Sequence, residues 1–118
     1  MEVNSLLNLA RRLPINDDAE NLKRIRHAIF FGHVLILKSG GRIVGYAEVY
    51  RMQEPPSYPV IPWPVDDPKG KILYCWAAVC EEGYLFELIR LGKRTFPDCH
   101  CISWHRHRRN NKIHFERI

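Results

Sequence analysis

The amino-terminal third of the chain predicts two amphipathic helices, because its apolar residues recur every three or four positions. The first helix spans residues 4–13 and ends at Pro14, which cannot continue a helical hydrogen-bond ladder. The second begins at Asp17, with Glu20 three residues later in a capping-box arrangement, and ends at Gly32. Its apolar stripe comprises Leu22, Ile25 and Ile29, and its other faces carry Lys23, Arg24 and Arg26.

A β-hairpin is predicted directly after these helices. Residues 33–38 and 42–52 are largely apolar, and the Ser-Gly-Gly sequence at 39–41 suits a tight turn between two strands. Gly45 interrupts the second strand and marks a bulge.

The second half of the chain predicts a strand at 71–80, a helix from 81 to 95 and a hairpin of strands 99–106 and 112–118. Two hairpins that flank a strand–helix unit are typical of an α+β domain. We therefore predict a single domain over residues 1–118 with a mostly antiparallel sheet of about five strands. Two N-terminal helices precede this sheet, and one helix follows its third strand.

Residues 53–70 hold six of the eight prolines, together with Tyr58, Trp63, Asp66 and Asp67. A stretch this rich in proline can form neither a helix nor a central strand. Its aromatic residues favour a packed loop over a free linker. A plain packed crossover, a lid over a substrate site and a partner-binding element are the interpretations that stay open.

The composition is that of a folded domain. The chain has 118 residues, of which 46% are hydrophobic and 26% charged, and this excludes intrinsic disorder, collagen and coiled coils. The longest apolar runs are far shorter than the roughly 20 residues of a membrane-spanning helix, so no membrane span is predicted. Lys and Arg total 18 against 13 Asp and Glu, and the net charge of +5 favours anionic partners.

The four cysteines, at positions 75, 80, 99 and 101, are predicted to be reduced thiols in the cytoplasm, because the chain shows no secretory signal. Cys99-His100-Cys101 invites a zinc interpretation. Its two cysteines share one face of a strand, however, and not the turn on which structural zinc sites are usually built. Since free cysteine also packs as a small core residue, no metal site is predicted.

Three stretches of the chain carry a family resemblance. Leu9-Ala10-Arg11-Arg12-Leu13-Pro14-Ile15 is similar to the N-terminal segment of the RTX toxin-activating lysine acyltransferases, and residues 41–47 are similar to their second strand. Cys75-Trp76-Ala77-Ala78, followed by residues 83–85 and 95–98, resembles their Trp-x-Ala strand, the next helix and its Phe-Pro-Asp stop. That family is a divergent branch of the GNAT acyltransferases, whose element order this chain resembles. The resemblance implies a GNAT-like fold and an origin among phage or mobile-element genes, with host cytoplasm or virion as location.

The chain departs from this branch at its catalytic positions. The resemblance aligns Ala10 with the branch's histidine and Cys75 with its aspartate, and neither residue can replace a general base. Residues 79–83 carry one glycine and two carboxylates, whereas a GNAT pyrophosphate loop is rich in glycine so that backbone N–H groups can approach phosphate. We therefore predict a catalytically impaired acyltransferase-like protein that acts by binding an unidentified protein partner.

An active acyltransferase with a relocated base is one alternative. His27 at the polar edge of the second helix, or His33 at the start of the first strand, would take a proton from an amine. Asp66 or Asp67 would lie nearby, and Cys75 is a candidate acyl acceptor. An acyl-CoA or acyl-carrier-protein thioester would be the cofactor, whereas the impaired protein needs none. Ordinary edge histidines are the competing interpretation.

A nucleic-acid-binding module is the second alternative, because the final hairpin is rich in cations and aromatic rings. The candidate binding residues are Trp104, Arg106, Arg108, Arg109 and Lys112. Alternation of apolar and polar residues along both strands equally suits a half-buried hairpin at a sheet edge. A homodimer is the remaining partner considered.

Overall fold

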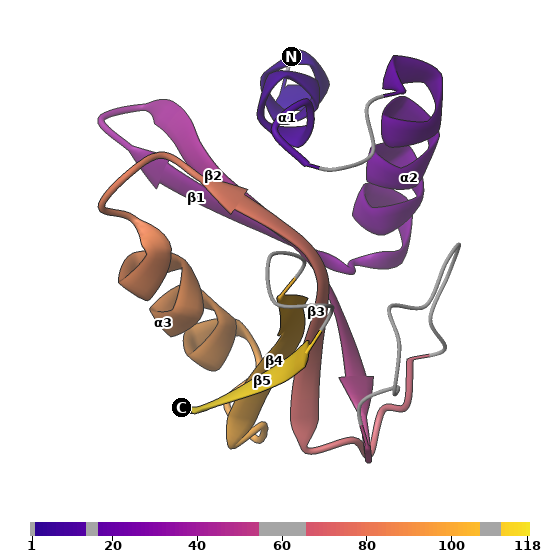
Figure 1. Ribbon diagram of the computed structural model, residues 1–118, viewed down its shortest axis with the longest axis vertical. Coiled ribbons are helices and arrows are strands. Elements are labelled where there is room, and N and C mark those ends of the chain that lie inside the picture. Colours follow the sequence, from indigo (N-terminus) through magenta and orange to yellow (C-terminus); the bar gives the residue numbers. More distant parts are fainter. Residues whose placement is uncertain (1, 14–16, 55–65, 107–111) are drawn as a thin grey trace. The chain divides into compact units, whose positions relative to one another are not determined.

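The structure, a computed structural model, describes residues 2–13, 17–54, 66–106 and 112–118 (Figure 1). The described residues form the elements α1 (Glu2–Ala10), α2 (Asp18–Phe31), β1 (Val34–Ser39), β2 (Arg42–Met52), β3 (Ile72–Cys80), α3 (Leu85–Thr95), β4 (Cys101–Arg106) and β5 (Lys112–Arg117). The strands belong to one sheet in the order β1-β2-β3-β4-β5. Its β1–β2 and β4–β5 pairs are antiparallel and its β3–β4 pair is parallel, so the sheet is mixed. The α+β class and the element order predicted from the sequence are confirmed.

The first helix is shorter than predicted. It ends at Ala10, and the backbone N–H groups of Arg12 and Leu13 then donate to the carbonyls of Leu9 and Ala10, at 3.0 Å each. These bonds span three residues instead of four, which tightens the chain before it reaches Pro14.

The third helix begins later than predicted, at Leu85 and not at position 81. Residues 81–84 form a turn in which the N–H of Tyr84 donates to the carbonyl of Glu81 at 3.2 Å. Gly83 has a φ of 90°, a backbone conformation that an α-helix cannot contain. This glycine therefore separates the acidic pair at 81–82 from the helix.

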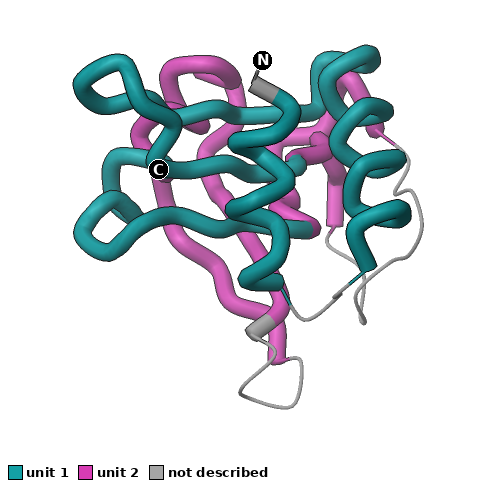
Figure 2. The backbone as a smooth tube through the Cα atoms, turned by 90° about the horizontal axis from the view of Figure 1, so that it is seen from above, with its two compact units in different colours: residues 1–48, 77–88 teal, residues 49–76, 89–118 magenta. Residues whose placement is uncertain are grey.

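The chain divides into two compact units, coloured separately in Figure 2. The first unit comprises Met1–Glu48 and Ala77–Leu88. Its core packs the apolar faces of α1 and α2 against the sheet residues of the same unit, and the buried cluster consists of Leu6, Leu9, Ala10, Ile25 and Tyr46. Burial of these side chains supplies most of the stability of short helices, which are marginal in isolation.

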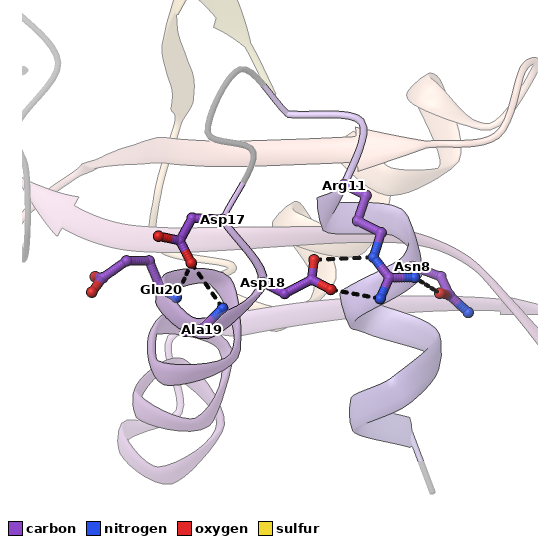
Figure 3. Close-up of polar contacts among 6 residues, drawn as sticks. All are labelled: Asn8, Arg11, Asp17, Asp18, Ala19 and Glu20. Carbon is purple, nitrogen blue, oxygen red and sulfur yellow. Dashed lines mark hydrogen bonds and ion pairs between the residues drawn. The ribbon is translucent and has the colours of Figure 1, made fainter.

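The start of α2 is fixed by two acidic residues (Figure 3). The carboxylate of Asp17 accepts from the backbone N–H groups of Ala19 and Glu20, which confirms Asp17 as the N-cap. Asp18 forms a two-pronged ion pair with Arg11, whose guanidinium also donates to Asn8 at the end of α1. This hydrogen-bonded pairing lowers the pKa of Asp18 and ties the end of α1 to the start of α2.

The bulge predicted in β2 lies beside Gly45. Leu37 pairs with Gly45 and Lys38 pairs with Ile43, so Val44 is an extra residue on β2. A Cβ atom on Gly45 would lie 3.1 Å from the Cβ of Cys80. Close packing, and not a left-handed backbone, therefore accounts for glycine here.

The second unit comprises Val49–Trp76 and Ile89–Ile118. Its buried apolar residues include Val49, Tyr50, Leu73 and Ile102. Gly70 lies against the end of β2, where a Cβ atom would be 2.4 Å from the backbone nitrogen of Met52. No side chain fits at this position, because the obstructing atoms belong to the backbone.

Candidate functional site

A buried charge network lies in the first unit. The Nε of Arg24 on α2 donates to both carboxylate oxygens of Glu48 on β2, at 2.9 and 3.2 Å, and its Nη1 donates to Asn21 at 2.7 Å. The Tyr46 hydroxyl donates to the same carboxylate. None of these four residues is more than 5% exposed. The predicted placement of Arg24 away from the buried face is therefore wrong.

This network is suited to joining α2 to the sheet and unsuited to proton transfer with a substrate. Glu48 is only 1% exposed and already accepts from Arg24 and Tyr46. Burial, followed by the charge of Glu48, raises the pKa of Tyr46, so its phenol stays protonated and donates. A buried charge needs a partner of this kind, because an unpaired one is strongly destabilising.

A different arrangement occurs in the second unit, where β3 and β4 pair over three residues only. The paired residues are Ile72 with Cys101, Leu73 with Ile102 and Tyr74 with Ser103. Both strands continue, to Cys80 and Arg106. The two parallel strands therefore stop pairing after Tyr74 and Ser103, which are the third residues of their strands.

Three polar side chains gather at this point. The Tyr74 hydroxyl lies 2.7 Å from Nδ1 of His105, and their rings meet edge to face. Ser103 lies two residues before His105, on the same face of β4. Its Oγ is buried and has no hydrogen-bond partner among the described residues. A buried hydroxyl without a partner costs about 1–3 kcal/mol, so the burial of Ser103 without a hydrogen bond is unfavourable.

The environment sets the protonation of Tyr74. Burial, with a smaller contribution from Cys75, raises the pKa of its phenol from 10.0 to about 12. At neutral pH Tyr74 is therefore protonated and can donate to the imidazole of His105. A tyrosine–histidine pair of this kind can pass a proton along its hydrogen bond in either direction.

The structure distributes the sequence-predicted catalytic residues over both units. His27 lies on α2 with its ring 4.6 Å from that of Phe31, and His33 lies between α2 and β1 with its N–H bonded to the carbonyl of Ala28. Cys75 is 4% exposed on β3 of the second unit. Ala10, aligned with the family's histidine, is fully buried in the core cluster of the first unit. The roles predicted for His27, His33 and Cys75 stay predictions.

The turn that would hold a pyrophosphate is occupied by other interactions. The backbone N–H of Glu81 donates to the carbonyl of Val44 at 2.8 Å, and the Glu81 carboxylate forms an ion pair with Arg42. The Tyr84 hydroxyl donates to Ser39 at 3.3 Å. The backbone N–H and the carboxylate of Glu81 therefore both bind to β2 within the first unit.

The proline-rich stretch is described only at its ends, since residues 55–65 lie outside the described residues. Asp66 accepts from the backbone N–H of Arg51 at 2.7 Å and from its guanidinium at 2.9 Å. Asp67 accepts from the backbone of Lys69 and from Gln53, which lowers the pKa of its carboxyl. The two carboxylates thus bind the residues that follow the proline-rich stretch to Arg51 and Gln53, which precede it.

The predicted nucleic-acid residues are described in part. Arg106 and Lys112 are register partners at the end of the final hairpin where residues 107–111 connect its strands, and the half-buried Trp104 packs its ring 4.6 Å from that of His114. Arg108 and Arg109 lie outside the described residues. The nucleic-acid surface stays a prediction.

The described residues show neither a grouped metal-binding set nor a membrane-spanning helix. All four cysteines are free thiols, and burial raises the pKa of Cys80, Cys99 and Cys101. Within residues 2–13, 17–54, 66–106 and 112–118, no three His, Cys, Asp or Glu side chains are grouped to hold a metal ion. The helices described here are too short or too polar to cross a bilayer.

Two solved structures share the fold of this chain. One is GphF, a GNAT-like decarboxylase in complex with isobutyryl-CoA, with a TM-score of 0.55 and 19% identity over 86% of this chain. The chain spans 60% of the length of that protein. The other, assigned as an acetyltransferase, is from Staphylococcus aureus MU50 and has a TM-score of 0.50 at 19% identity, over 86% of this chain and 72% of that one. No family model and no curated protein sequence matches the chain. The fold is therefore GNAT-like.

The sequence pattern does not single out the Tyr74, Ser103 and His105 group. Tyr74 falls within the predicted strand 71–80 and His105 within the predicted strand 99–106, and neither is among the candidate site residues. A weak signal existed, because Ser103 and His105 alternate with Ile102 and Trp104 along the predicted strand. It could not show that these polar residues face inward beside Tyr74, since both faces of β4 carry buried residues.

Proposed function

We propose that this protein binds an acyl thioester, of coenzyme A or of an acyl carrier protein, where β3 and β4 stop pairing, and that Tyr74 and His105 transfer protons there. The 2.7 Å contact between these two side chains, next to the last β3–β4 residue pair, carries the proposal. One protein of similar fold is a decarboxylase in complex with isobutyryl-CoA and another is assigned as an acetyltransferase, which supports a thioester as the ligand class.

The strand arrangement suits the shape of such a ligand. The arm that carries the thioester in both donors contains secondary amides, and amides can pair with strand backbones in place of a neighbouring strand. The buried hydroxyl of Ser103 would donate to an amide or acyl carbonyl of this arm.

The reaction would be acyl transfer to an amine. The amine nitrogen forms a bond to the acyl carbon as the carbon–sulfur bond breaks, His105 takes the proton of the amine, and Tyr74 gives its proton to the leaving thiolate. The protonated imidazole then returns a proton to the phenolate across the 2.7 Å contact. Both groups regain their starting charge, with the imidazole as its other tautomer, and the products are an amide and a free thiol.

Binding without turnover is the second candidate function. Tyr74 is 1% and His105 6% exposed, so little of either side chain is accessible to a substrate. The position aligned with the toxin-activating family's histidine is a buried alanine, Ala10. In this form the chain is a diverged, impaired relative of that branch, encoded by a phage or mobile element and acting on a protein partner.

Calorimetric titration with coenzyme A, acetyl-CoA and isobutyryl-CoA tests binding, and chromatographic release of coenzyme A in the presence of a primary amine tests turnover. The variants are Tyr74→Phe, His105→Gln and the matched control His100→Gln, which changes an exposed histidine just before β4.

Saturable thioester binding with release of coenzyme A that falls at least about tenfold in Tyr74→Phe and His105→Gln, but not in His100→Gln, supports acyl transfer. Thioester binding without release of coenzyme A above the uncatalysed rate supports the second candidate function, binding without turnover. Absence of binding by all three ligands rejects the proposal for coenzyme A thioesters.

A further inference from the structure

Among the described strands β5 is an edge of the sheet, since the strand order places only β4 beside it. Its side chains are largely exposed, including Lys112, Phe115, Glu116 and Arg117. Unpaired backbone groups at such an edge form a template for another strand.

The register of the β4–β5 pair determines which backbone groups point outward. Ile118 donates to the carbonyl of His100 at 3.0 Å, so this is a hydrogen-bonded pair. In antiparallel strands such pairs alternate with non-hydrogen-bonded ones. Even-numbered residues of β5 thus bond to β4, while the N–H and C=O groups of Ile113, Phe115 and Arg117 point away from it.

We propose that β5 pairs antiparallel with β5 of a second copy of this chain, around a twofold axis that passes beside His114. The residues whose backbone groups point away from β4 must face one another in such a pair. Odd-numbered residues of one copy therefore lie opposite odd-numbered residues of the other. With His114 opposite its own copy, Ile113 lies opposite Phe115 and Lys112 lies opposite Glu116, each combination occurring twice.

Charge and apolar complementarity select this register. Lys112 and Glu116 share a face of β5. In this register Lys112 of each copy lies opposite Glu116 of the other, at a non-hydrogen-bonded position, where paired side chains lie closest. The carboxylate of Glu116 has one oxygen 3.2 Å from His114 Nε2 within its own chain, which leaves the other for Lys112 of the second copy. On the opposite face, Phe115 is 48% exposed and would be covered by Ile113.

The neighbouring permitted register, centred on Phe115, is less complementary. It places Arg117 opposite Ile113 and removes Lys112 from Glu116. The other edge strand is β1. Its pairing with β2 shifts register between Leu37 and Lys38, opposite the bulge on β2, and an irregularity of this kind opposes regular pairing with a further strand.

Charge reversal tests both the dimer and its register. Sedimentation equilibrium from about 5 to about 500 μM, a range suited to a small interface, should show a reversible dimer of the wild-type chain. Lys112→Glu and Glu116→Lys should each weaken the dimer at least about tenfold, because each faces like charges across the axis. An equimolar mixture of the two variants should restore dimers, since their charges are complementary. The double variant Lys112→Glu/Glu116→Lys should also dimerise.

Oxidative cross-linking provides an independent measurement. His114→Cys should form an intermolecular disulfide, because paired Cα atoms at a non-hydrogen-bonded position are about 4.5 Å apart. The matched control Lys112→Cys should not, since the two copies of residue 112 would be about 13 Å apart. The wild-type chain measures any cross-linking by the native cysteines.

A wild-type chain that stays monomeric over the whole range overturns the proposal and would mean that the edge charges prevent pairing. A dimer that tolerates both single reversals, or that cross-links equally through positions 112 and 114, rejects this interface.

Discussion

Arg24 of α2 and Glu48 of β2 form an ion pair inside the first unit, with 2.9 Å between Nε and Oε2 and with both side chains almost fully buried. The pair joins residues that are 24 positions apart. It therefore fixes how α2 is rotated against the sheet, because the guanidinium reaches the carboxylate from only one face of the helix. Tyr46 and Asn21 satisfy further atoms of the pair.

Removal of one partner should destabilise the fold more than removal of both charges. Arg24→Met and Glu48→Gln should each lower the free energy of unfolding by about 3–5 kcal/mol, because each leaves a buried charge uncompensated. The double variant should lose less than the sum of the two. Urea unfolding of all four proteins measures the coupling, and strict additivity would show that the two charges act independently.

Introducing the acyltransferase family's histidine at position 10 should not restore chemistry. Ala10 is fully buried among Leu6, Leu9 and Ile25, so Ala10→His would overpack the core and cost about 1–3 kcal/mol. Asn8→His, at an exposed position of the same helix, is the control and should leave the melting temperature within a few degrees of wild type. An Ala10→His variant as stable as this control would contradict the packing argument.

Substitution by alanine should destabilise the fold more at Gly70 than at Gly45, because the atoms that surround the two glycines differ. Gly70→Ala should cost about 3 kcal/mol or more, because the new Cβ would lie 2.4 Å from the backbone nitrogen of Met52. Gly45→Ala should cost about 1 kcal/mol, since its nearest atom, the Cβ of Cys80, is 3.1 Å away. Chemical denaturation of the two variants gives the comparison, and the reverse order would refute it.

Stability should fall at high pH through Tyr74. Its folded-state pKa of about 12 exceeds the value of 10.0 for a free phenol, so its contribution is complete below pH 10 and is lost as the pH rises through about 12. Thermal unfolding from about pH 8 to pH 12 should therefore show a smaller decline for Tyr74→Phe than for wild type. Burial also raises the pKa of Tyr46, which leaves a residual decline in that variant.

The control for this titration is Tyr84→Phe, whose hydroxyl is only part-buried and makes a long, 3.3 Å bond to Ser39. It should follow the wild-type curve. Ultraviolet absorbance of phenolate should show fewer tyrosines ionised near pH 11 in the folded chain than after denaturation, and complete ionisation of the folded chain at that pH would argue against a protected Tyr74.

The cap of α2 offers a test of local sequence rules. Asp17→Ala should lower stability by about 1 kcal/mol, because the backbone N–H groups of Ala19 and Glu20 lose their acceptor. Asp17→Asn should lose much less, since the amide oxygen still accepts. Equal losses in the two variants, measured by thermal unfolding, would indicate that charge and not capping matters at this position.

The sequence by itself determined the elements and the class of the fold. Apolar periodicity, the cap at Asp17, the turn at Gly40 and Gly41 and the stops at proline are local signals, since each depends on residues within one helical turn or one hairpin. They gave β2 its observed limits and located its bulge beside Gly45. They placed the start of α3 too early, because the left-handed conformation of Gly83 depends on the turn around it.

Only the tertiary structure decided which polar residues meet. Arg24 is one of three cations on a predicted polar face, and periodicity cannot show that it alone turns inward to Glu48. Likewise, Tyr74 and His105 are 31 positions apart, and their contact follows from the parallel register that sets Tyr74 beside Ser103. Local patterns report which side of an element is apolar, whereas a buried polar side chain is stable only beside a specific partner, and the chain's path through space supplies that partner.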